Sequence, residues 1–282
     1  MVIDTSFLKQ LDRLNLLINK RVTSNFIGEK KSMAVGKGLI FKDHRIYAPG
    51  DDFRNIDWKV FARTDDFFIK NYEEERNLVV HIIVDSSASM EFGKLKKFDY
   101  ASMLALGFAY LASRNNEKVH FSTFAEDVSL FNPAKGRFTI GPMLKYLESV
   151  KPQGKSLMDK SFSHYRRSIG SKSLVIVISD FLINPEVIEQ AFFHLGKQQL
   201  KVVQVLDPVE KNLAFDGECD FIDSETGSRL KSYVSPRIKS FFQKKLDEHA
   251  TKIHSFVDAL GGEFFQITTD TAVFDAFFRM LR

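Results

Sequence analysis

The chain has 282 residues, of which 44% are hydrophobic and 27% are charged, and its formal net charge is +4. This composition is that of a globular protein, and the charge is too small to indicate nucleic-acid binding by itself. The single cysteine, Cys219, excludes an internal disulfide framework and a cysteine-rich zinc site. Because no apolar stretch has the length of a signal peptide or a membrane helix, we expect a cytoplasmic protein without a membrane span.

The first expected element is a helix over residues 5–20. Four apolar residues recur there at helical spacing, namely Phe7, Leu11, Leu14 and Ile18. Such a stripe usually packs against the chain's own domain, and the alternative is that it lies in a groove of a partner protein.

Residues 30–77 are polar, irregular and rich in turn signals. Residues 48–52 form a strong turn signal, and residues 67–72 are typical of a strand. After residue 77, strand-like and helix-like patterns alternate. This change of pattern predicts an N-terminal extension over residues 1–77 and a folded domain over residues 78–282.

Within the second region, apolar runs predict strands, the first three of them buried on both faces, at 78–85, 173–179, 200–206 and 263–268. A short hairpin is expected from strands at 119–124 and 128–131. Helices are expected at 97–115, 138–149, 157–168, 185–196 and 236–260, with a short one at the end of the chain. Residues 209–235 predict short strands at most. The alternation predicts an α/β fold with a mainly parallel sheet flanked by helices.

Three of the predicted buried strands end in an aspartate, at Asp85, Asp180 and Asp207. Parallel strands place their carboxyl ends on one edge of the sheet, which is where ligands of such sheets bind. We therefore expect the three carboxylates to lie on one rim. A single aspartate at such a position is ordinary, because aspartate also starts turns and caps helices.

Asp85 is followed by serines at alternate positions, Ser87 and Ser89. An extended loop points alternate side chains the same way, so one carboxylate and two hydroxyls would form the all-oxygen set that a hard cation such as Mg²⁺ prefers. The alternative is a helix N-cap, for which Asp and Ser are the favoured residues.

The segment Val84–Met90 resembles the first motif, Asp-x-Ser-x-Ser, of the metal-ion-dependent adhesion site (MIDAS) of von Willebrand factor A domains. Ser156 is similar in position to the threonine of the second motif, and Asp180 is similar to the third. The resemblance implies a von Willebrand factor A-like (Rossmann-like) fold and one bound Mg²⁺, or Mn²⁺ or Ca²⁺. Its ligands would be Asp85, Ser87, Ser89, Ser156 and Asp180. Serine keeps the hydroxyl of threonine but lacks the stiffness of a β-branched side chain.

A longer resemblance is to domain-of-unknown-function family 58, a branch with the same metal motif. It is carried by Arg45–Trp58 and Ala62–Thr64, and also by Asp207–Glu210 and Ser224–Gly227. Members of that family are encoded near, and work with, MoxR-type AAA+ ATPases, so the resemblance implies such an ATPase or its client as a partner. Many members carry membrane helices before the motif, which we do not find in this sequence.

The hallmark segment, Arg45–Thr64, has two interpretations. Its charged residues could form an ionic network that folds the N-terminal segment onto the sheet. Alternatively, Tyr47, Trp58 and the arginines could form a docking face for a partner. The charged residues of the first interpretation are Arg45, Asp51, Asp52, Arg54, Asp57 and Arg63.

Two further assignments concern residues of the predicted sheet. Asp207 and Glu210 are interpreted as a turn, with tuning of a cation on the rim as the alternative. His81 lies inside a predicted buried strand and is expected to be a hydrogen-bonded core residue, since the seven histidines form no metal-binding pattern.

We therefore expect a metal-ion-dependent protein-binding module, an adaptor for a MoxR-type AAA+ ATPase, in which an acidic side chain of the partner completes the coordination of the metal. No catalytic residue is assigned, and an enzyme is not expected. The alternative is a metal-dependent hydrolase or phosphatase at the same site, although no general base, phosphate loop or nucleophile elbow is found. Nucleic-acid binding through the first fifty residues, with nine Lys and Arg against four Asp and Glu, is disfavoured by the carboxylate-rich rim.

Overall fold

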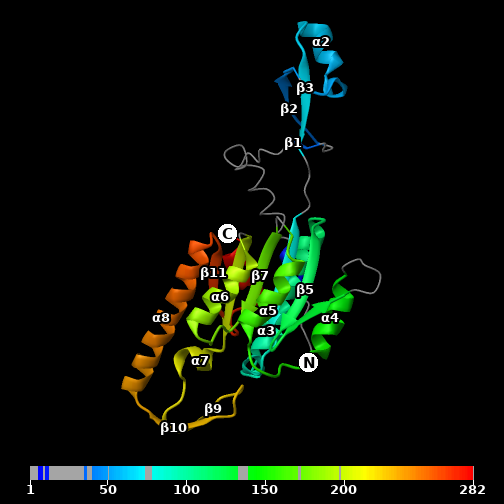
Figure 1. Ribbon diagram of the computed structural model, residues 1–282. Coiled ribbons are helices and arrows are strands. Elements are labelled where there is room, and N and C mark those ends of the chain that lie inside the picture. The colour runs from blue at the N-terminus through cyan, green and yellow to red at the C-terminus, as the bar shows by residue number, and fades with distance from the viewer. Residues whose placement is uncertain are drawn as a thin grey trace. The chain divides into compact units, whose positions relative to one another are not determined.

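The computed structural model describes residues 6–8, 10–12, 35–36, 40–49, 51–73, 78–132, 139–170, 173–196 and 198–281. The chain forms two compact units, which we call the small unit (residues 21–77) and the large unit (residues 1–20 and 78–282) (Figure 1). Residues 1–20 therefore belong to the large unit, whereas the sequence interpretation placed them in one extension with the residues that follow.

Packing explains why the N-terminal residues join the large unit. Leu11 is fully buried in its core, and the ring of Phe7 stacks on that of Phe277 with centroids 6.5 Å apart. The Tyr110 hydroxyl also donates a hydrogen bond to Asp12 at 2.7 Å. The stripe thus packs on the chain's own domain, and its other two members, Leu14 and Ile18, lie outside the described residues.

The large unit is built on a six-stranded sheet with the order β11-β8-β7-β4-β5-β6. All neighbouring strands run parallel except β5 and β6, which form the expected antiparallel hairpin. The strands are β4 (Val79–Asp85), β5 (Lys118–Phe124), β6 (Val128–Phe131), β7 (Ser173–Ser179), β8 (Gln199–Leu206) and β11 (Glu263–Thr268).

Helices cover both faces of this sheet, because successive side chains of a strand point to opposite faces. Ile82 of β4 belongs to one apolar core and Ile83 to the other. The first core is shared with α3 (Lys97–Arg114), α4 (Ile140–Ser149) and α9 (Val273–Met280). The second is shared with α5 (Met158–Tyr165), α6 (Pro185–Leu195) and α8 (Pro236–Ala259) (Figure 1). The expected α/β class, with a mainly parallel sheet flanked by helices, is confirmed.

Local signals set the ends of the helices that follow β7 and β10. The Asn184 side chain accepts from the backbone of Glu186 at the start of α6, and Pro185 occupies the first helical position, where no N–H is needed. After α8 the chain turns at Gly261, whose φ is +71°. A side chain at Gly262 would meet the Leu200 carbonyl at 2.7 Å, so this turn lies directly against β8.

Residues 209–235 are more regular than expected. After the short helix α7 (Pro208–Asn212) they form a two-stranded antiparallel hairpin of β9 (Gly217–Ile222) and β10 (Arg229–Val234). This hairpin is a sheet of its own; β9 alternates between half-buried and exposed residues, and β10 is mostly exposed. Its strands carry many polar residues because much of the hairpin faces solvent. The polar composition is the reason that these two strands were not predicted as regular elements.

The small unit is also more regular than its polar sequence indicated. It contains a three-stranded antiparallel sheet with the order β1-β3-β2, formed by β1 (Val35–Gly36), β2 (Ile40–Ile46) and β3 (Phe68–Glu73). The short helices η1 (Phe53–Asn55) and α2 (Trp58–Thr64) lie between β2 and β3. Only β3 was predicted, because β2 carries the charged sequence Lys42-Asp43-His44-Arg45 in its centre. None of the helices in the described parts of the chain is long and apolar enough to cross a lipid bilayer.

Candidate metal-binding site

The strand order of the sheet reverses between β4 and β7, which is the topological switch point. From β4 the chain passes through α3 to β5 on one side, and from β7 it passes through α6 to β8 on the other. A crevice at the carboxyl ends of such strands is where ligands bind in open α/β sheets. Asp85 ends β4, and Asp180 directly follows β7, so the topology brings these two predicted residues to the switch point.

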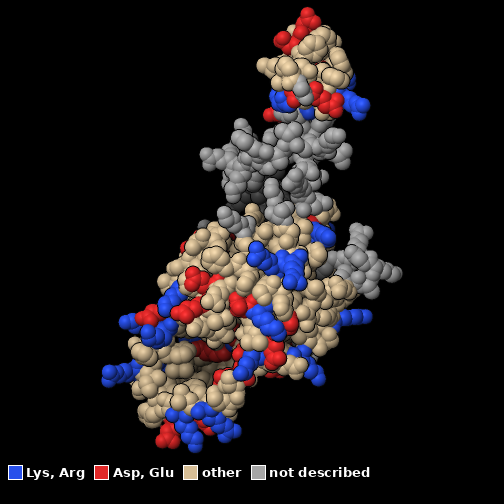
Figure 2. Space-filling view, in the orientation of Figure 1, with Lys and Arg blue, Asp and Glu red and all other residues tan. Residues whose placement is uncertain are grey.

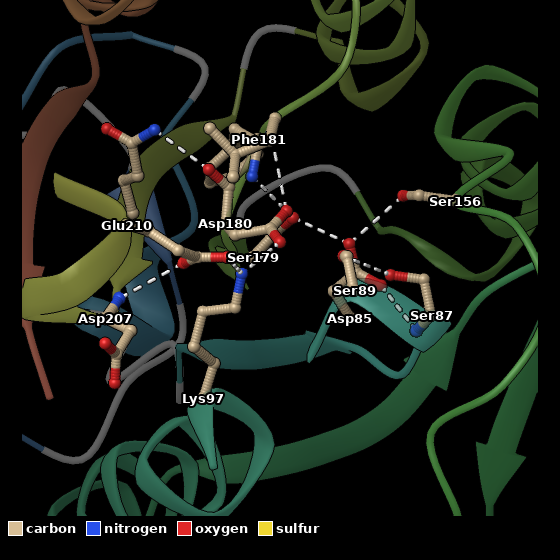
Figure 3. Close-up of polar contacts among 12 residues, drawn as sticks. Asp85, Ser87, Ser89, Lys97, Ser156, Ser179, Asp180, Phe181, Asp207 and Glu210 are labelled. Carbon is tan, nitrogen blue, oxygen red and sulfur yellow. Dashed lines mark hydrogen bonds and ion pairs between the residues drawn. The ribbon is translucent and has the colours of Figure 1, made fainter. Parts of the chain in front are cut away.

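Asp85 is the centre of a buried hydrogen-bonded cluster (Figure 3). Its Oδ1 accepts from the Ser87 backbone N–H at 2.8 Å, and its Oδ2 accepts from the Ser156 hydroxyl at 3.1 Å. The Ser87 and Ser89 hydroxyls lie 3.1 Å apart. The structure therefore brings together four of the five predicted ligand residues. As the N-cap alternative expected, Ser87 stands at the N-cap position of the short helix η2 (Ala88–Glu91), but its side chain makes no capping hydrogen bond.

Backbone contacts hold the loop of Ser156 in place. The Ala88 N–H donates to the Gly154 carbonyl at 2.9 Å, and the Gln153 N–H donates to the Ser86 carbonyl at 2.9 Å. Gly154 has a φ of +79°, a conformation that residues with a Cβ rarely adopt. The loop that carries Ser156 is thus joined directly to the loop that carries Ser87 and Ser89.

Asp180, the fifth predicted residue, forms an ion pair that the sequence did not indicate. Its Oδ2 accepts from the Lys97 ammonium at 2.7 Å, and the same ammonium donates to Glu210 Oε1 at 2.8 Å. Lys97 comes from the first turn of α3, and its side chain has no exposed surface. In Figure 3 it rises from the helix toward Asp180. A lysine at a helix start is ordinarily exposed, so spacing alone gave no signal for it.

Ser179 is a second residue that the sequence interpretation missed. Its hydroxyl donates to Asp85 Oδ2 at 2.6 Å, which joins the ends of β7 and β4 by a side-chain bond. It was interpreted only as the last residue of a buried strand. The Gln204 amide, on β8, donates to the Asp180 carbonyl at 2.8 Å and links the third strand to the same edge.

Asp207 and Glu210 fulfil the turn interpretation and also reach the rim. Asp207 accepts from the Val209 N–H at 2.8 Å, and Glu210 Oε2 accepts from the Asp207 N–H at 3.2 Å, which is a capping box at the start of α7. The other oxygen of Glu210 is the one bound to Lys97. Glu210 therefore connects the third strand end to the ion pair of Asp180.

The electrostatics of this rim are dominated by buried carboxylates. Burial, and then the charge of Asp180, raise the pKa of Asp85 to about 6. Burial also raises the pKa of Glu210. For Lys97 burial acts to lower the pKa, but the charges of Asp180 and Glu210 outweigh it and the pKa is raised. The ammonium thus remains charged, and it offsets part of the negative charge on the rim.

A further carboxylate, Glu225, reaches the site from the β9–β10 hairpin. Glu225 Oε1 accepts from the Ser156 N–H at 3.3 Å, and burial followed by the charges of Asp180 and Asp223 raises its pKa against the effect of that hydrogen bond. In the sequence Glu225 belonged only to a stretch similar to family 58, and it was not assigned to the site.

The donors at the switch point fit a hard divalent cation in kind, since all are carboxylate or hydroxyl oxygens. In the described residues no group of three or more His, Cys, Asp and Glu side chains is arranged to hold a metal ion. The fit therefore depends on the hydroxyls of Ser87, Ser89 and Ser156 beside Asp85.

The charged residues of the hallmark segment pair within the small unit. Arg45 forms a two-pronged bond with Asp51, at 2.6 and 2.8 Å. Asp57 caps α2 and binds His44 at 2.9 Å, and that hydrogen bond, with lesser help from the backbone and Lys70, lowers the pKa of Asp57 to about 2. Part of the expected ionic network is present, with His44 as a member that was not predicted. No ion pair joins Arg54 or Arg63 to another described residue.

Three large apolar residues of the same segment are exposed, whereas Tyr47 is half-buried. Trp58 is 59% exposed, and Ile46 and Phe53 are more exposed still. Tyr47 lies edge-on to Phe67 with ring centroids 6.3 Å apart. These apolar side chains are not explained by the ionic pairs, so the docking-face interpretation stays open beside the structural one.

His81 is a core residue, as expected. It is 1% exposed, its Nδ1 lies 2.8 Å from the Tyr165 hydroxyl, and its ring stacks on that of His120 at 5.0 Å. Burial, and then the charges of His120 and Lys118, lower the pKa of His81 to about 4. The ring is neutral at physiological pH.

Comparison with known proteins identifies relatives without assigning an activity. Uncharacterized proteins of Mycobacterium tuberculosis and Mycobacterium bovis are 24% identical over 274 residues, a match that covers 95% of this chain and 86% of theirs. An aerotolerance-related membrane protein from Bacteroides fragilis aligns with 18% identity and a TM-score of 0.48, over 72% of this chain and 98% of its own. The conserved hypothetical protein BatB from Bacteroides thetaiotaomicron aligns with 16% identity and a TM-score of 0.46, over 72% and 97%.

The family described as "Protein of unknown function DUF58" matches residues 43–252, which include the hallmark segment, the cluster around Asp85 and the β9–β10 hairpin. This match covers most of the chain, and the chain therefore belongs to the DUF58 family.

Proposed function

We propose that the chain is a metal-ion-dependent protein-binding module with a von Willebrand factor A-like fold, and not an enzyme. The observation that carries the proposal is the hydrogen-bonded set of Asp85, Ser87, Ser89 and Ser156 at the switch point of the sheet. Asp180, on the neighbouring strand, would complete the set. Oxygen donors of this kind suit Mg²⁺, Mn²⁺ or Ca²⁺.

The charges at the site favour binding of an acidic partner. Asp85 would be the charged ligand, and three hydroxyls would be neutral ligands. Lys97 already offsets the charge of Asp180. A bound cation would supply an electrophilic centre with charge left to attract a carboxylate of another protein. Such a bond is charge-assisted and is lost when the cation is removed.

The partner is proposed from the resemblance stated above. We expect a MoxR-type AAA+ ATPase or its client to supply the acidic side chain. The same resemblance and the oxygen-rich rim give no reason to expect nucleic acid as the ligand.

Calorimetric titration with Mg²⁺ and Mn²⁺ tests the site. Wild type should bind one cation, and Ser87→Ala should bind it at least tenfold more weakly, because one ligand is lost from the cluster. Ser86→Ala is the matched control, since the Ser86 hydroxyl donates to the Phe124 carbonyl at 3.0 Å and not to the cluster. Equal affinities in wild type and Ser87→Ala would show that the assignment is wrong.

Surface plasmon resonance tests the use of the site. The purified ATPase should bind wild type in Mg²⁺ and lose at least tenfold in affinity with chelator or with Asp85→Asn. Chelator should add little to Asp85→Asn, because both changes remove one interaction. Sustained Mg²⁺-dependent hydrolysis of phosphate esters by the pure protein, abolished in Asp180→Asn, would instead support the hydrolase alternative.

A further inference from the structure

The position of Glu225 distinguishes it from the other carboxylates on the rim. Asp85, Asp180 and Glu210 belong to the ends of the main sheet or to α7, whereas Glu225 belongs to the turn of a separate hairpin. Its carboxylate accepts from the Ser156 N–H at 3.3 Å. It thus contacts one of the five proposed ligand residues from an element outside the main sheet.

The turn that presents Glu225 is ordered by its own side chains. Asp223 accepts from the Glu225 N–H at 2.8 Å and from the Thr226 hydroxyl at 2.6 Å. Gly227, with a φ of +70°, closes the turn through a backbone bond to the Asp223 carbonyl at 2.8 Å. A carboxylate held in this way binds with little further loss of conformational entropy.

The hairpin itself is suited to moving away from the site. Its two strands pair only with each other among the described residues, and isolated two-stranded hairpins are marginally stable in water. Ile222, Leu230 and Tyr233 are all more than half exposed, and the buried apolar residue Val234 lies at the end of β10 that is far from the turn. Figure 2 shows the hairpin at the bottom of the large unit, with acidic side chains visible in the hollow above it.

We propose that Glu225 binds the cation site in cis, in the position that a partner's carboxylate would take, so that the β9–β10 hairpin is an autoinhibitory arm of this chain. The proposal rests on the proposed function above. A partner must then displace Glu225. The measured binding free energy is therefore the difference between the binding free energies of the partner's carboxylate and of Glu225 at the same position. Without a cation the Glu225 carboxylate keeps the hydrogen bond from the Ser156 N–H, and it is opposed by the charge of Asp180.

Water-proton relaxation of the Mn²⁺-loaded full chain tests the occupancy of that position. In Glu225→Gln the bound Mn²⁺ should carry about one more exchangeable water than in wild type, because a neutral amide is a poor substitute for the carboxylate. Acetate, used as the free carboxylate probe, should occupy that coordination position at concentrations at least fivefold lower in Glu225→Gln, where it displaces only a water, than in wild type, where it must displace Glu225. Glu218→Gln, the same change at an exposed position of the same hairpin, should behave as wild type.

Hydrogen exchange of residues 217–234 gives an independent readout of the arm. Mn²⁺ should slow exchange there in wild type and in Glu218→Gln, but not in Glu225→Gln. If Mn²⁺ binds and Ser87→Ala weakens it, yet hydration and hairpin protection are the same in wild type and Glu225→Gln, the arm is disproved and the proposed function stands. If wild type binds no Mn²⁺, both proposals are wrong.

Discussion

Lys97 is a lysine with no exposed side-chain surface, held between the carboxylates of Asp180 and Glu210. An ammonium is costly to remove from water, and it is retained here because two charges and two hydrogen bonds compensate it. Its place beside a candidate cation site means that the chain carries its own positive charge on the rim. In the proposed function, Lys97 would therefore weaken the attraction of the rim for a metal ion.

Replacing Lys97 by methionine should strengthen cation binding and weaken the fold without cation. The loss of the ammonium leaves Asp180 and Glu210 as uncompensated buried charges, an arrangement that typically costs about 3 to 5 kcal/mol. A divalent cation would relieve this repulsion, so Mg²⁺ affinity should rise at least tenfold. Calorimetry and urea unfolding with and without Mg²⁺ measure the two effects.

Lys96→Met is the control for that experiment, because Lys96 is the adjacent residue and pairs with Glu91 at the surface. It should leave both the unfolding free energy and the Mg²⁺ affinity close to those of wild type. A Lys97→Met protein with unchanged or weaker Mg²⁺ affinity would exclude Lys97 as a competitor of the cation.

His81 should make the protein sensitive to mild acid. Its pKa is about 6.5 in an unfolded chain and about 4 in the fold, so the unfolded state binds the proton first. The stability contributed by neutral His81 is complete above pH 6.5 and is lost as the pH falls toward 4. Between pH 7 and 5 this amounts to about 2 kcal/mol.

Comparison of wild type with His81→Gln isolates this effect from that of Asp85, whose raised pKa acts in the opposite direction over the same range. Glutamine can still bind the Tyr165 hydroxyl. Chemical unfolding at pH 7 and pH 5 should show wild type losing more free energy than His81→Gln. Equal losses in the two proteins would mean that the pKa of His81 is the same in the folded and the unfolded states.

At the scale of elements, close packing fixes how helices lie on the sheet. Gly107 lies in the middle of α3, where a Cβ would be 2.4 Å from the Phe277 ring of α9 and 3.1 Å from Leu11. Glycine is unfavourable in a helix, yet no larger residue permits this approach. The contact joins the N-terminal residues, α3 and the C-terminal helix, which are far apart in the sequence.

Gly107→Ala should therefore destabilise the large unit although alanine is the better helix former. Overpacking costs about 1 to 3 kcal/mol, against a gain of about 1 kcal/mol in helix propensity. Gly141→Ala in α4 is the control, because nothing lies within 4 Å of its added Cβ and it should be neutral or stabilising. Urea unfolding distinguishes the two, and equal stability of both variants would mean that α9 adjusts freely.

At the scale of the whole molecule, the two candidate binding features lie on different units. The large unit carries the candidate cation site, and the small unit carries the exposed side chains Ile46, Phe53 and Trp58. On the visible face of the large unit, basic and acidic side chains are interspersed (Figure 2). Charged residues of the small unit form ion pairs such as Arg45 with Asp51, which is a structural role. No such role accounts for its exposed apolar residues.

We predict that Trp58→Ala weakens binding of the ATPase at least tenfold and leaves cation affinity and unfolding temperature unchanged. Tryptophan is common among the central interface residues that contribute most to affinity, and truncation to alanine removes its contact area with the partner. Lys59→Ala, an exposed neighbour on α2, should bind as wild type. Surface plasmon resonance combined with thermal unfolding separates the alternatives, since a structural role for Trp58 would lower the unfolding temperature together with the affinity.

The amino-acid sequence by itself determined the order and type of most elements of the large unit. Apolar runs such as β4 and β7, and the apolar face of α3, are long and periodic, so burial fixes them locally. It also placed Asp85 and Asp180 on one rim, because parallel strands have a fixed direction. The amphipathic ribbon of β9 and β10 and the charged strand β2 escaped prediction, since their pairing partners and not their local pattern make them strands.

The tertiary structure alone decided the charge partners of the site. Lys97 is 83 residues from Asp180 and 113 from Glu210 along the chain, and Glu225 is 69 from Ser156. Ser179 meets Asp85 across 94 residues. Local pattern carries no information about such contacts, because a lysine or glutamate is ordinarily solvated and becomes a buried partner only when packing removes water around it. The sequence therefore located the candidate site, and packing determined which charges surround it.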